Sequence, residues 1–357
     1  MHVFLALMFV AAATAELAPL LKNSEPIPGK YIIKLRDDFN IDEIASTVRL
    51  SGGKVGNLFR NVLHGFAAEL SDEVLDIVRG LRAVEYVEQD GVYRTQVTWG
   101  LDRIDQRDLP LNNGYSPRGT GSGYTVWVID TGVSASHNDF GSRATQVVNF
   151  AAGSNSDCNG HGTHCAGTVG SSTYGVAKSV TIKGVKVLNC IGSGTNSGVI
   201  SGVDYVKYYS GSNDVASMSL GGGISTALDT AVEQLISSGV PTAVAAGNDD
   251  ANACLSSPAR VSTAITVGAT DSSDYRSYFS NYGGCLDIFA PGSSITSTWH
   301  TSDSATNTIS GTSMACPHVA GAITLFGKST SSMLSSASSN KISDVGSNSP
   351  NKLLYVG

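Results

Sequence analysis

The sequence has little charge and no long apolar run beyond its first 20 residues. Asp, Glu, Lys and Arg make up 15% of the 357 residues, against a usual share of about 25%, and the net charge is −7. This acidic balance excludes a nucleic-acid binder, which normally carries a basic face. No stretch after residue 20 approaches the roughly 18 apolar residues that a membrane span needs. The apolar share of 41% is large enough for a sizeable core, which excludes a disordered chain.

Glycine is abundant, with 40 residues, and there are six cysteines. The chain opens with a short apolar block from Phe4 to Ala13, which ends in the small-x-small pattern Ala13-Thr14-Ala15. This pattern predicts a secretory signal peptide, residues 1–15, that is cut after Ala15. The alternative is a buried N-terminal helix. Secretion would place the protein outside the cell and its cysteines in an oxidising compartment.

A change in composition divides the rest of the chain. Of the 81 residues from 16 to 96, 23 are charged, whereas only 30 of the 261 residues from 97 to 357 are charged, and Glu233 is the one glutamate of this second stretch. Segments that differ this much are typical of separate domains. We therefore expect a boundary between Tyr93 and Thr98, with domains at 16–96 and 97–357.

The first segment has the pattern of a small α+β unit. Its apolar side chains alternate or recur at helical spacing, and Ser71 is placed to cap the second helix. The expected elements are a strand at Tyr31–Leu35, a helix at Ile41–Leu50, a strand at His64–Leu70, a helix that includes Val74, Leu75, Val78 and Leu81, and a strand at Ala83–Glu88. The order β-α-β-α-β indicates the ferredoxin-like class.

The second segment alternates short apolar strands with helices. Strands are expected at Tyr124–Ile129, Thr181–Val187, Val215–Leu220, Pro241–Ala246 and Ala264–Val267, and helices at Ser197–Tyr208 and Thr226–Ser238. This alternation predicts an α/β domain with a parallel sheet and helices on both faces.

Two patches of this segment carry groups suited to proton transfer. Val-Ile-Asp130-Thr-Gly is an apolar strand that ends in an aspartate, and functional groups collect at the carboxyl ends of parallel strands. Asp130 could also be a simple cap or turn residue. In His161-Gly-Thr-His164, the flanking glycines let the backbone pack around His161, which suits a general base. The two histidines could instead bind a metal, but their spacing differs from the zinc-binding pattern and favours a structural role for His164.

The third patch is Gly-Thr-Ser313-Met-Ala-Cys-Pro317. Because proline is tolerated in the first turn of a helix, Pro317 predicts a helix that begins close to Ser313. The backbone N–H groups at that helix end could stabilise an oxyanion beside Ser313. Ser313 could be only a helix cap, but its tightly packed, glycine-flanked setting favours a nucleophile. Asp, His and Ser in this order form one of the three known chain orders of the same catalytic triad.

With their neighbours, the three patches resemble the catalytic signatures of the subtilisin-like serine proteases, and the resemblance covers residues 16–357. The cysteine after His164 and the stretch Ser-Phe279-Ser-Asn-Tyr are similar to the proteinase K subfamily. Trp99 to Leu111 resembles the start of its aqualysin- and Vibrio-type secreted members. The resemblance implies a subtilisin-like α/β catalytic domain that follows a small ferredoxin-like α+β propeptide domain.

The resemblance also implies roles for individual residues. Ser313 would attack the scissile carbonyl, and His161 would accept its proton. Asp130 would orient the imidazole, and Asn248 would donate to the oxyanion. Substrate would bind as an added strand, and a small uncharged wall would favour an apolar or aromatic residue before the cleaved bond, at P1. The substrate-binding residues would be Gly192, Ser193 and Gly194, then Ser219, Leu220 and Gly221, and the wall Ala245, Ala246 and Gly247.

Disulfides and calcium sites follow from the same resemblance. It pairs Cys158 with Cys190 and Cys254 with Cys285, and it leaves Cys165 and Cys316 either as two buried thiols, which we favour, or as a third pair. Structural Ca²⁺, a hard cation that prefers oxygen ligands, is expected at two sites. One site would use Asp287 with the carbonyls of Ser262 and Ala264. The other would use Asp102, Asp105, Gln106 and Asn112, where Asn112 replaces an aspartate of the family.

The sequence therefore predicts a secreted, monomeric serine endopeptidase that is made as an autoprocessed zymogen. Its partners would be protein and peptide substrates and its own propeptide, acting as inhibitor and folding template, with no nucleic acid and no membrane span. One alternative is a catalytically inactive binding protein, although all four catalytic positions are filled. The other is a protease inhibitor built on residues 16–96, although a complete catalytic domain follows.

Overall fold

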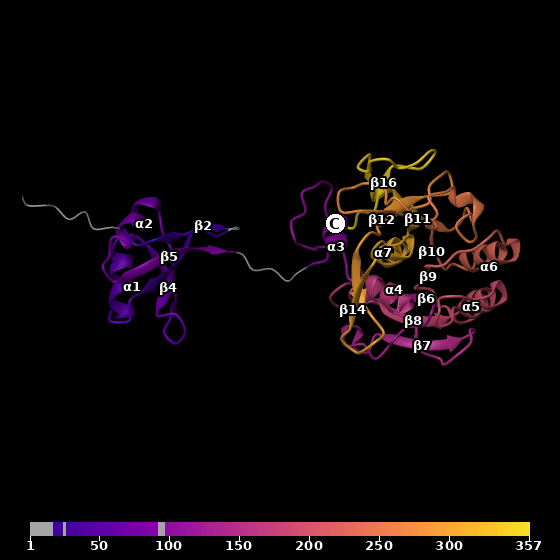
Figure 1. The fold of residues 1–357 in the computed structure, drawn as a ribbon, viewed down its shortest axis with the longest axis horizontal. Helices are drawn as coiled ribbons and strands as arrows, with labels where there is room; N and C mark the ends of the chain where they lie inside the picture. Colours follow the sequence, from indigo (N-terminus) through magenta and orange to yellow (C-terminus); the bar gives the residue numbers. More distant parts are fainter. Residues whose placement is uncertain (1–16, 24–25, 92–96) are drawn as a thin grey trace, which may run out of the picture. The chain divides into compact units, whose positions relative to one another are not determined.

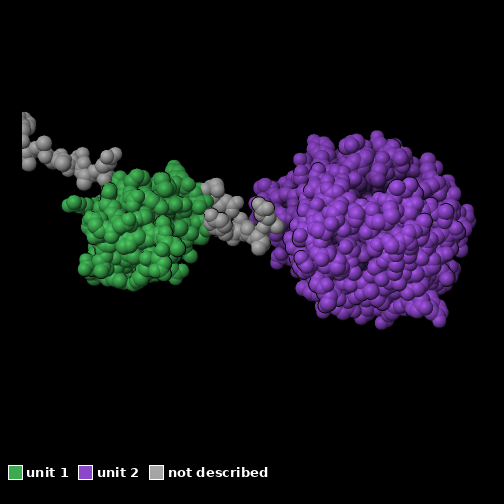
Figure 2. Space-filling view, turned by 60° about the horizontal axis from the view of Figure 1, so that its bottom comes forward, with its two compact units in different colours: residues 1–95 green, residues 96–357 purple. Residues whose placement is uncertain are grey.

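The computed structural model describes residues 17–23, 26–91 and 97–357. The chain divides into two compact units, residues 1–95 and 96–357, which Figure 2 colours green and purple. The predicted signal peptide and the predicted end of the propeptide at residue 96 lie outside the described residues. Within the described part of the chain, no helix is both long and apolar enough to cross a membrane.

The described residues of the first unit form a five-stranded sheet with two helices. The elements are β1 (Leu20–Leu21), β2 (Pro26–Leu35), α1 (Ile41–Leu50), β3 (Lys54–Phe59), β4 (Gly65–Glu69), α2 (Asp72–Arg79) and β5 (Val84–Gly91). The sheet order is β1-β5-β2-β4-β3, and from β2 onward the chain follows the β-α-β-β-α-β order of the ferredoxin-like class. The helix predicted at 41–50 is confirmed, and Ser71 caps α2 by accepting the Val74 N–H.

Strand β3 is an element that the sequence prediction lacks. Its pairing with β4 shifts between Val55 and Leu58, where Gly56 and Asn57 interrupt the regular register. Both residue types have low strand propensity, and the irregularity breaks the alternation by which a strand is recognised. Apolar side chains from the sheet and from both helices form one core, which includes Ile33, Phe66 and Val87 from the strands and Val48 and Val78 from the helices.

The second unit alternates strands and helices from residue 99 onward. Its elements are α3 (Trp99–Ile104), β6 (Thr125–Asp130), the 3₁₀ turn Asn138–Phe140, β7 (Ala144–Asn149), α4 (His161–Gly170), β8 (Thr181–Lys186), α5 (Asn196–Tyr209), β9 (Asp214–Met218), α6 (Thr226–Ser237), β10 (Thr242–Ala245), the 3₁₀ turn Ala253–Leu255, β11 (Ile265–Thr270), β12 (Ile288–Pro291), β13 (Ile295–Thr298), β14 (Thr306–Ile309), α7 (Thr312–Leu325), α8 (Thr330–Ser336), β15 (Ser338–Ser339) and β16 (Lys352–Leu353). The five predicted strands and two predicted helices are confirmed within three residues of their ends.

The main sheet has the order β15-β16-β12-β11-β10-β9-β6-β8-β7, and its paired strands are parallel except for β15 and β16. Alternate side chains of β6 face opposite sides of this sheet. Val126 and Val128 pack in the core that contains α4 and α7, whereas Trp127 and Ile129 pack against α5 and α6. Helices therefore cover both faces, as the sequence predicts (Figure 1).

The carboxyl ends of neighbouring strands bring the predicted catalytic residues to one edge of this sheet. Asp130 is the last residue of β6, Ser219 follows β9, and Asn248 lies three residues after β10. Helices α4 and α7 begin at the same edge, with His161 as the first residue of α4 and Ser313 as the second residue of α7.

Candidate active site

Asp130 and His161 are joined by a short hydrogen bond. Asp130 is fully buried at the end of β6, and its Oδ1 lies 2.7 Å from Nδ1 of His161. The same oxygen accepts the backbone N–H of Thr131 at 2.6 Å. A carboxylate at Nδ1 holds the ring proton on that nitrogen and leaves Nε2 to accept a proton from a reacting group.

The loop before α4 fixes the position of His161. The buried Asp157 accepts three backbone N–H groups at the helix start, those of Asn159, Gly160 and Thr163. Gly160 has a φ of 105°, and a Cβ at this position would lie 2.4 Å from the Trp299 ring. The close approach that the sequence suggests around His161 is thus real at Gly160, where a larger residue does not fit.

The two histidines of this patch differ in their electrostatics. Burial of the His161 imidazole disfavours its charged form, but Asp130 and Cys165 together outweigh burial and raise the pKa of His161 well above its usual value. The His161 side chain is still 26% exposed. His164 is fully buried, with Nε2 2.9 Å from the carbonyl of Ile295, and burial lowers its pKa to about 4. His164 is therefore a neutral residue of the interior.

Ser313 lies at the start of α7, next to Asn248. The helix begins at Thr312, after Gly311, so Pro317 is its sixth residue and lies beyond the first turn in which the sequence argument places it. Asn248 accepts the backbone N–H of Thr312 at 2.8 Å and its hydroxyl at 3.0 Å, both through Oδ1. Because Oδ1 is occupied, the amide nitrogen of Asn248 is the group left to act as a donor.

Two cavities meet at Ser313 and contain most of the predicted substrate-binding residues. The larger, about 470 Å³, is lined by His161 and Ser313 and by the predicted residues Gly192, Ser193, Gly194, Ser219, Leu220 and Gly221. The smaller, about 250 Å³, is lined by Leu220, Gly221, Ala245, Gly247, Asn248 and Ser313. Ala246 lines neither cavity, because its side chain is fully buried in a cluster with Leu286 and Phe289.

The smaller cavity also contains a carboxylate that the sequence argument misses. Asp249 follows Asn248 directly, is exposed, and lines this cavity. The expectation of a wall without an acid considers only Ala245 to Gly247 and is wrong for the cavity as a whole. Asp249 could have been identified from the sequence, because it directly follows Asn248.

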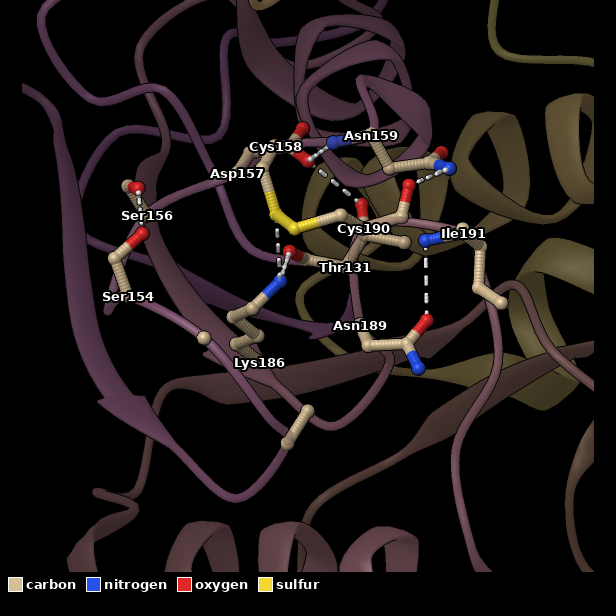
Figure 3. The surroundings of a disulfide bond; sticks show 12 residues. Thr131, Ser154, Ser156, Asp157, Cys158, Asn159, Lys186, Asn189, Cys190 and Ile191 are labelled. Atoms are coloured by element: carbon tan, nitrogen blue, oxygen red, sulfur yellow. Dashed lines mark hydrogen bonds between the residues drawn. A yellow bond between two sulfur atoms is a disulfide. The ribbon is translucent and has the colours of Figure 1, made fainter.

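A disulfide ties the loop before α4 to the loop after β8 (Figure 3). Cys158 is bonded to Cys190, and Nδ2 of Asn159 donates to the Cys190 carbonyl at 3.0 Å. The buried Lys186 donates to the Thr131 carbonyl at 2.7 Å, and its Nζ lies 3.6 Å from the sulfur of Cys158. These contacts connect the loop before His161 to the loop that carries the predicted substrate edge.

The remaining four cysteines form one disulfide and two thiols. Cys254 is bonded to Cys285, while Cys165 and Cys316 are buried and unpaired in the described structure. Burial raises the pKa of Cys165 and raises that of Cys316 to about 12, so both thiols stay protonated at neutral pH.

The predicted N-terminal calcium site has oxygen atoms that lack a partner. Among the described residues, Oδ1 of Asp105 and Oε1 of Gln106 are buried and accept no hydrogen bond. Burial raises the pKa of Asp105, and the nearby Asp102 raises it further. Asp102 accepts the N–H groups of Asn112 and Asn113 at 3.2 and 2.7 Å. A hard cation would satisfy these oxygens, so the residues present fit Ca²⁺.

The second predicted calcium site offers fewer oxygens that lack a hydrogen-bond partner. Asp287 accepts the Thr266 N–H at 2.8 Å through Oδ2, and burial raises its pKa. Thr266 is the second residue of β11. Of the two predicted partners, Ala264 lies directly before this strand and is buried, and Ser262 lies two residues earlier and is exposed. The N–H that Asp287 accepts thus places its carboxylate near its predicted partners, but among the described residues no buried side-chain oxygen of Asp287 or Ser262 lacks a hydrogen bond.

Comparison with known proteins identifies families that match each of the two units. The sequence matches the subtilase family over residues 121–352 and the peptidase inhibitor I9 family over residues 30–96. It is 46% identical to an extracellular serine proteinase of Thermus sp. (strain Rt41A), in an alignment that covers 97% of this chain and 94% of that protein. It is 47% identical to proteinase R of Parengyodontium album, with coverage of 86% and 81%.

A solved structure is similar over the second unit. The crystal structure of a cold-adapted subtilisin-like serine proteinase is 53% identical, has a TM-score of 0.71, and covers 74% of this chain and 99% of that chain. Because the family match spans well over half of the residues and the relatives align over most of their length, the chain belongs to the subtilase family and is a serine endopeptidase whose catalytic domain follows an inhibitor I9 domain.

Proposed function

We propose that the protein is a secreted endopeptidase in which Ser313, His161 and Asp130 form the catalytic triad and Asn248 completes the oxyanion hole. The observation that carries this proposal is the 2.7 Å contact between His161 Nδ1 and the buried Asp130, at the wall of a cavity that His161 shares with Ser313. The name of one relative, the extracellular serine proteinase of Thermus sp. (strain Rt41A), supports secretion and the predicted signal peptide at residues 1–15.

Each group has a defined step in this mechanism. Ser313 Oγ attacks the scissile carbonyl while Nε2 of His161 takes its proton, and the imidazolium later protonates the leaving amine. Asp130 keeps the proton on Nδ1 and stabilises the imidazolium. The oxyanion that forms is bound by the Asn248 amide nitrogen and by the backbone N–H of Ser313, since the N–H groups of Thr312 and Met314 already donate to other acceptors. In the resting structure, Ser313 Oγ donates to the Ser219 carbonyl at 3.1 Å, so it must turn toward His161 before it reacts.

Substrate is proposed to bind as an extended strand between the two predicted edges. Gly192–Gly194 and Ser219–Gly221 line the same cavity and offer backbone groups to a peptide laid between them. Main-chain recognition of this kind is independent of most side chains, which supports broad specificity. The smaller cavity, with its small residues Ala245 and Gly247, is the proposed P1 pocket and suits apolar or aromatic side chains.

Asp249 is expected to extend this preference to basic P1 residues. An exposed ion pair contributes about 0.2–1 kcal/mol, so Asp249→Asn should lower kcat/KM for a Lys or Arg P1 peptide about 1.4- to fivefold relative to the matching Phe peptide. Steady-state kinetics on the two peptides measure this ratio. Asp204→Asn is the control, because Asp204 is an exposed acid of α5 that lines neither cavity. An equal ratio in wild type and Asp249→Asn would exclude the contact.

Structural calcium is proposed at the Asp102, Asp105, Gln106 and Asn112 group, supported by its two unpartnered buried oxygens. The bound ion would neutralise Asp105 and tie this loop together, without a part in catalysis. The set of Asp287, Ser262 and Ala264 stays a prediction for a second ion.

Removal of calcium is expected to lower the thermal stability of the mature enzyme. A ligand present at about 100 times its Kd stabilises the native state by about 2.7 kcal/mol, which corresponds to a Tm shift of roughly 5 °C or more for a domain of this size. Scanning calorimetry with calcium and with excess EDTA measures the shift in an inhibitor-blocked sample, which prevents self-digestion. Asp105→Asn should remove most of the calcium dependence and Asp204→Asn should retain it. If the Tm of the wild type is the same with calcium and with excess EDTA, both calcium sites are ruled out.

The first unit is proposed to act as an intramolecular inhibitor and folding template. Self-cleavage at the end of residues 16–96 would then release it. Its match to the inhibitor I9 family supports this role, and the large parallel sheet of the second unit has many non-local pairings of the kind that fold slowly. The mature enzyme, residues 97–357, is expected to be a monomer.

The test of the proposed function is active-site labelling. A fluorophosphonate should label the secreted wild-type protein on Ser313, and tryptic mass spectrometry should locate the adduct. A processed protein that is neither labelled nor able to cleave denatured casein would favour the inactive binding protein over the enzyme.

A further inference from the structure

The helix of Ser313 contains a proline four residues after the nucleophile. In a regular helix, the residue at position 317 would donate its N–H to the carbonyl of Ser313. Pro317 has no N–H, and a proline ring in a helix crowds the carbonyl four residues earlier. The carbonyl of Ser313 therefore needs a hydrogen-bond donor from outside α7.

Two side chains from other elements supply that donor. The hydroxyl of Ser219 donates to the Ser313 carbonyl at 2.9 Å, and the thiol of Cys165 donates to it at 3.3 Å. Burial raises the pKa of Cys165, so the thiol keeps its proton, but a thiol is a weak donor. Ser219, only 4% exposed, is thus the main replacement for the missing N–H.

Ser313 returns the contact to the same residue. Its Oγ donates to the Ser219 carbonyl at 3.1 Å, so the two serines exchange a pair of hydrogen bonds between the end of β9 and the start of α7. Cys165 lies one turn after His161 in α4, and its sulfur is 3.9 Å from Nδ1 of that histidine. The elements that carry the nucleophile, the base and the substrate edge therefore meet at the carbonyl of Ser313.

We propose that Ser219 is a positioning residue for Ser313. The hydroxyl of Ser219 replaces the N–H that Pro317 lacks and fixes the first turn of α7. This role uses the side chain, whereas substrate binding at Ser219 uses its backbone. The inference rests on the proposed function, because it takes Ser313 as the nucleophile.

A double-mutant cycle on the full-length secreted chain tests the proposal. Ser219→Ala should lower kcat on a chromogenic peptide about tenfold or more, with KM within about twofold, since the backbone of residue 219 is retained. Pro317→Ala restores an N–H four residues after Ser313. In the double variant this N–H can satisfy the Ser313 carbonyl, so most of the kcat lost in Ser219→Ala should return.

Two further variants make the cycle decisive. Ser217→Ala removes a buried hydroxyl of β9, which lies 3.7 Å from the sulfur of Cys316 rather than at Ser313, and its kcat should equal that of the wild type. Ser219→Thr keeps the hydroxyl and should recover kcat relative to Ser219→Ala, which decides the question if Pro317→Ala does not fold. Failure of Ser219→Thr to recover kcat would also count against the proposal.

Two results of the cycle would overturn the proposal. In one, the double variant loses activity by the product of the two single losses. In the other, Ser219→Ala raises KM and leaves kcat unchanged. A wild-type protein that fluorophosphonate does not label would instead remove the proposed function itself, so the two failures can be told apart.

Discussion

Ser313→Ala is expected to yield a folded precursor that lacks measurable protease activity. Removal of the nucleophile of a triad costs about 10⁶-fold in kcat, because no other group can form the acyl intermediate. If the enzyme cuts its own propeptide, the variant should also stay as a chain that begins near residue 16. Gel analysis and N-terminal sequencing of the secreted product measure the processing, and peptide hydrolysis measures the activity.

Ser310→Ala is the matched control for this experiment. Ser310 lies three residues before the nucleophile, and its exposed hydroxyl accepts the backbone N–H of Ser294 rather than facing the cavities. This variant should mature and cleave like the wild type. If Ser313→Ala is secreted already cut near residue 96, a second protease does the processing, and the proposed self-cleavage is wrong.

The residues of the proposed triad could be picked out in the sequence because each lies in a short local pattern. Asp130 ends a short run of β-branched and aromatic residues that favours a buried strand, and glycines close to His161 and Ser313 indicate where the backbone must pack closely. The sheet then brings these patterns together, because the carboxyl ends of parallel strands share one edge.

Strands that depend on tertiary context were not predictable in the same way. β14 reads Thr-Asn-Thr-Ile and is half exposed, and β12 is a four-residue strand that ends in Pro291. Neither segment has the length or the alternation that identifies a strand without knowledge of its partner. Their positions follow from pairing with β13 and β11.

The parts of the site that the sequence did not reveal arise from contacts between distant residues or from local turns. Asp249 lines the smaller cavity two residues after Gly247, where the chain turns with a φ of 105°. Ser219 and Ser313 are 94 residues apart in the chain, so no local pattern predicts the exchange of hydrogen bonds between them. Conversely, Ala246 belongs to a motif of the family, but alternation along the chain turns its side chain into the interior.

The charge of Asp130 is expected to control both the rate and its dependence on pH. The general base must be neutral to accept the Ser313 proton, so kcat/KM of the wild type should rise with pH through the pKa of His161. Asp130 and the nearby Cys165 together raise that pKa well above its usual value of about 6.5. The acidic limb of the wild-type profile is therefore expected above pH 6.5, which would make the enzyme most active in alkaline solution.

Asp130→Asn should lower kcat by about 10⁴-fold and move the acidic limb to lower pH. The amide would donate to Nδ1 and force the proton onto Nε2, which then cannot accept the proton of Ser313. Loss of the negative charge also destabilises the imidazolium, which lowers the pKa of His161. The limb can be followed through the rate of fluorophosphonate labelling of Ser313 between pH 5 and 10, a readout that needs no substrate turnover.

The comparison requires mature protein and a control that retains the triad. The variant precursor can be cut by a trace of tagged wild-type enzyme, which is then removed on its tag, so that slow self-processing does not limit the yield. Asp303→Asn is the control, because Asp303 is an exposed acid that accepts the Ser136 hydroxyl. The labelling rate of Asp303→Asn and the position of its acidic limb should match those of the wild type.

If labelling of Asp130→Asn is slower but its acidic limb stays at the wild-type pH, Asp130 orients the His161 ring without raising its pKa. In that case the raised pKa of His161 would have to come from another group, and the nearby Cys165 would be the next residue to substitute.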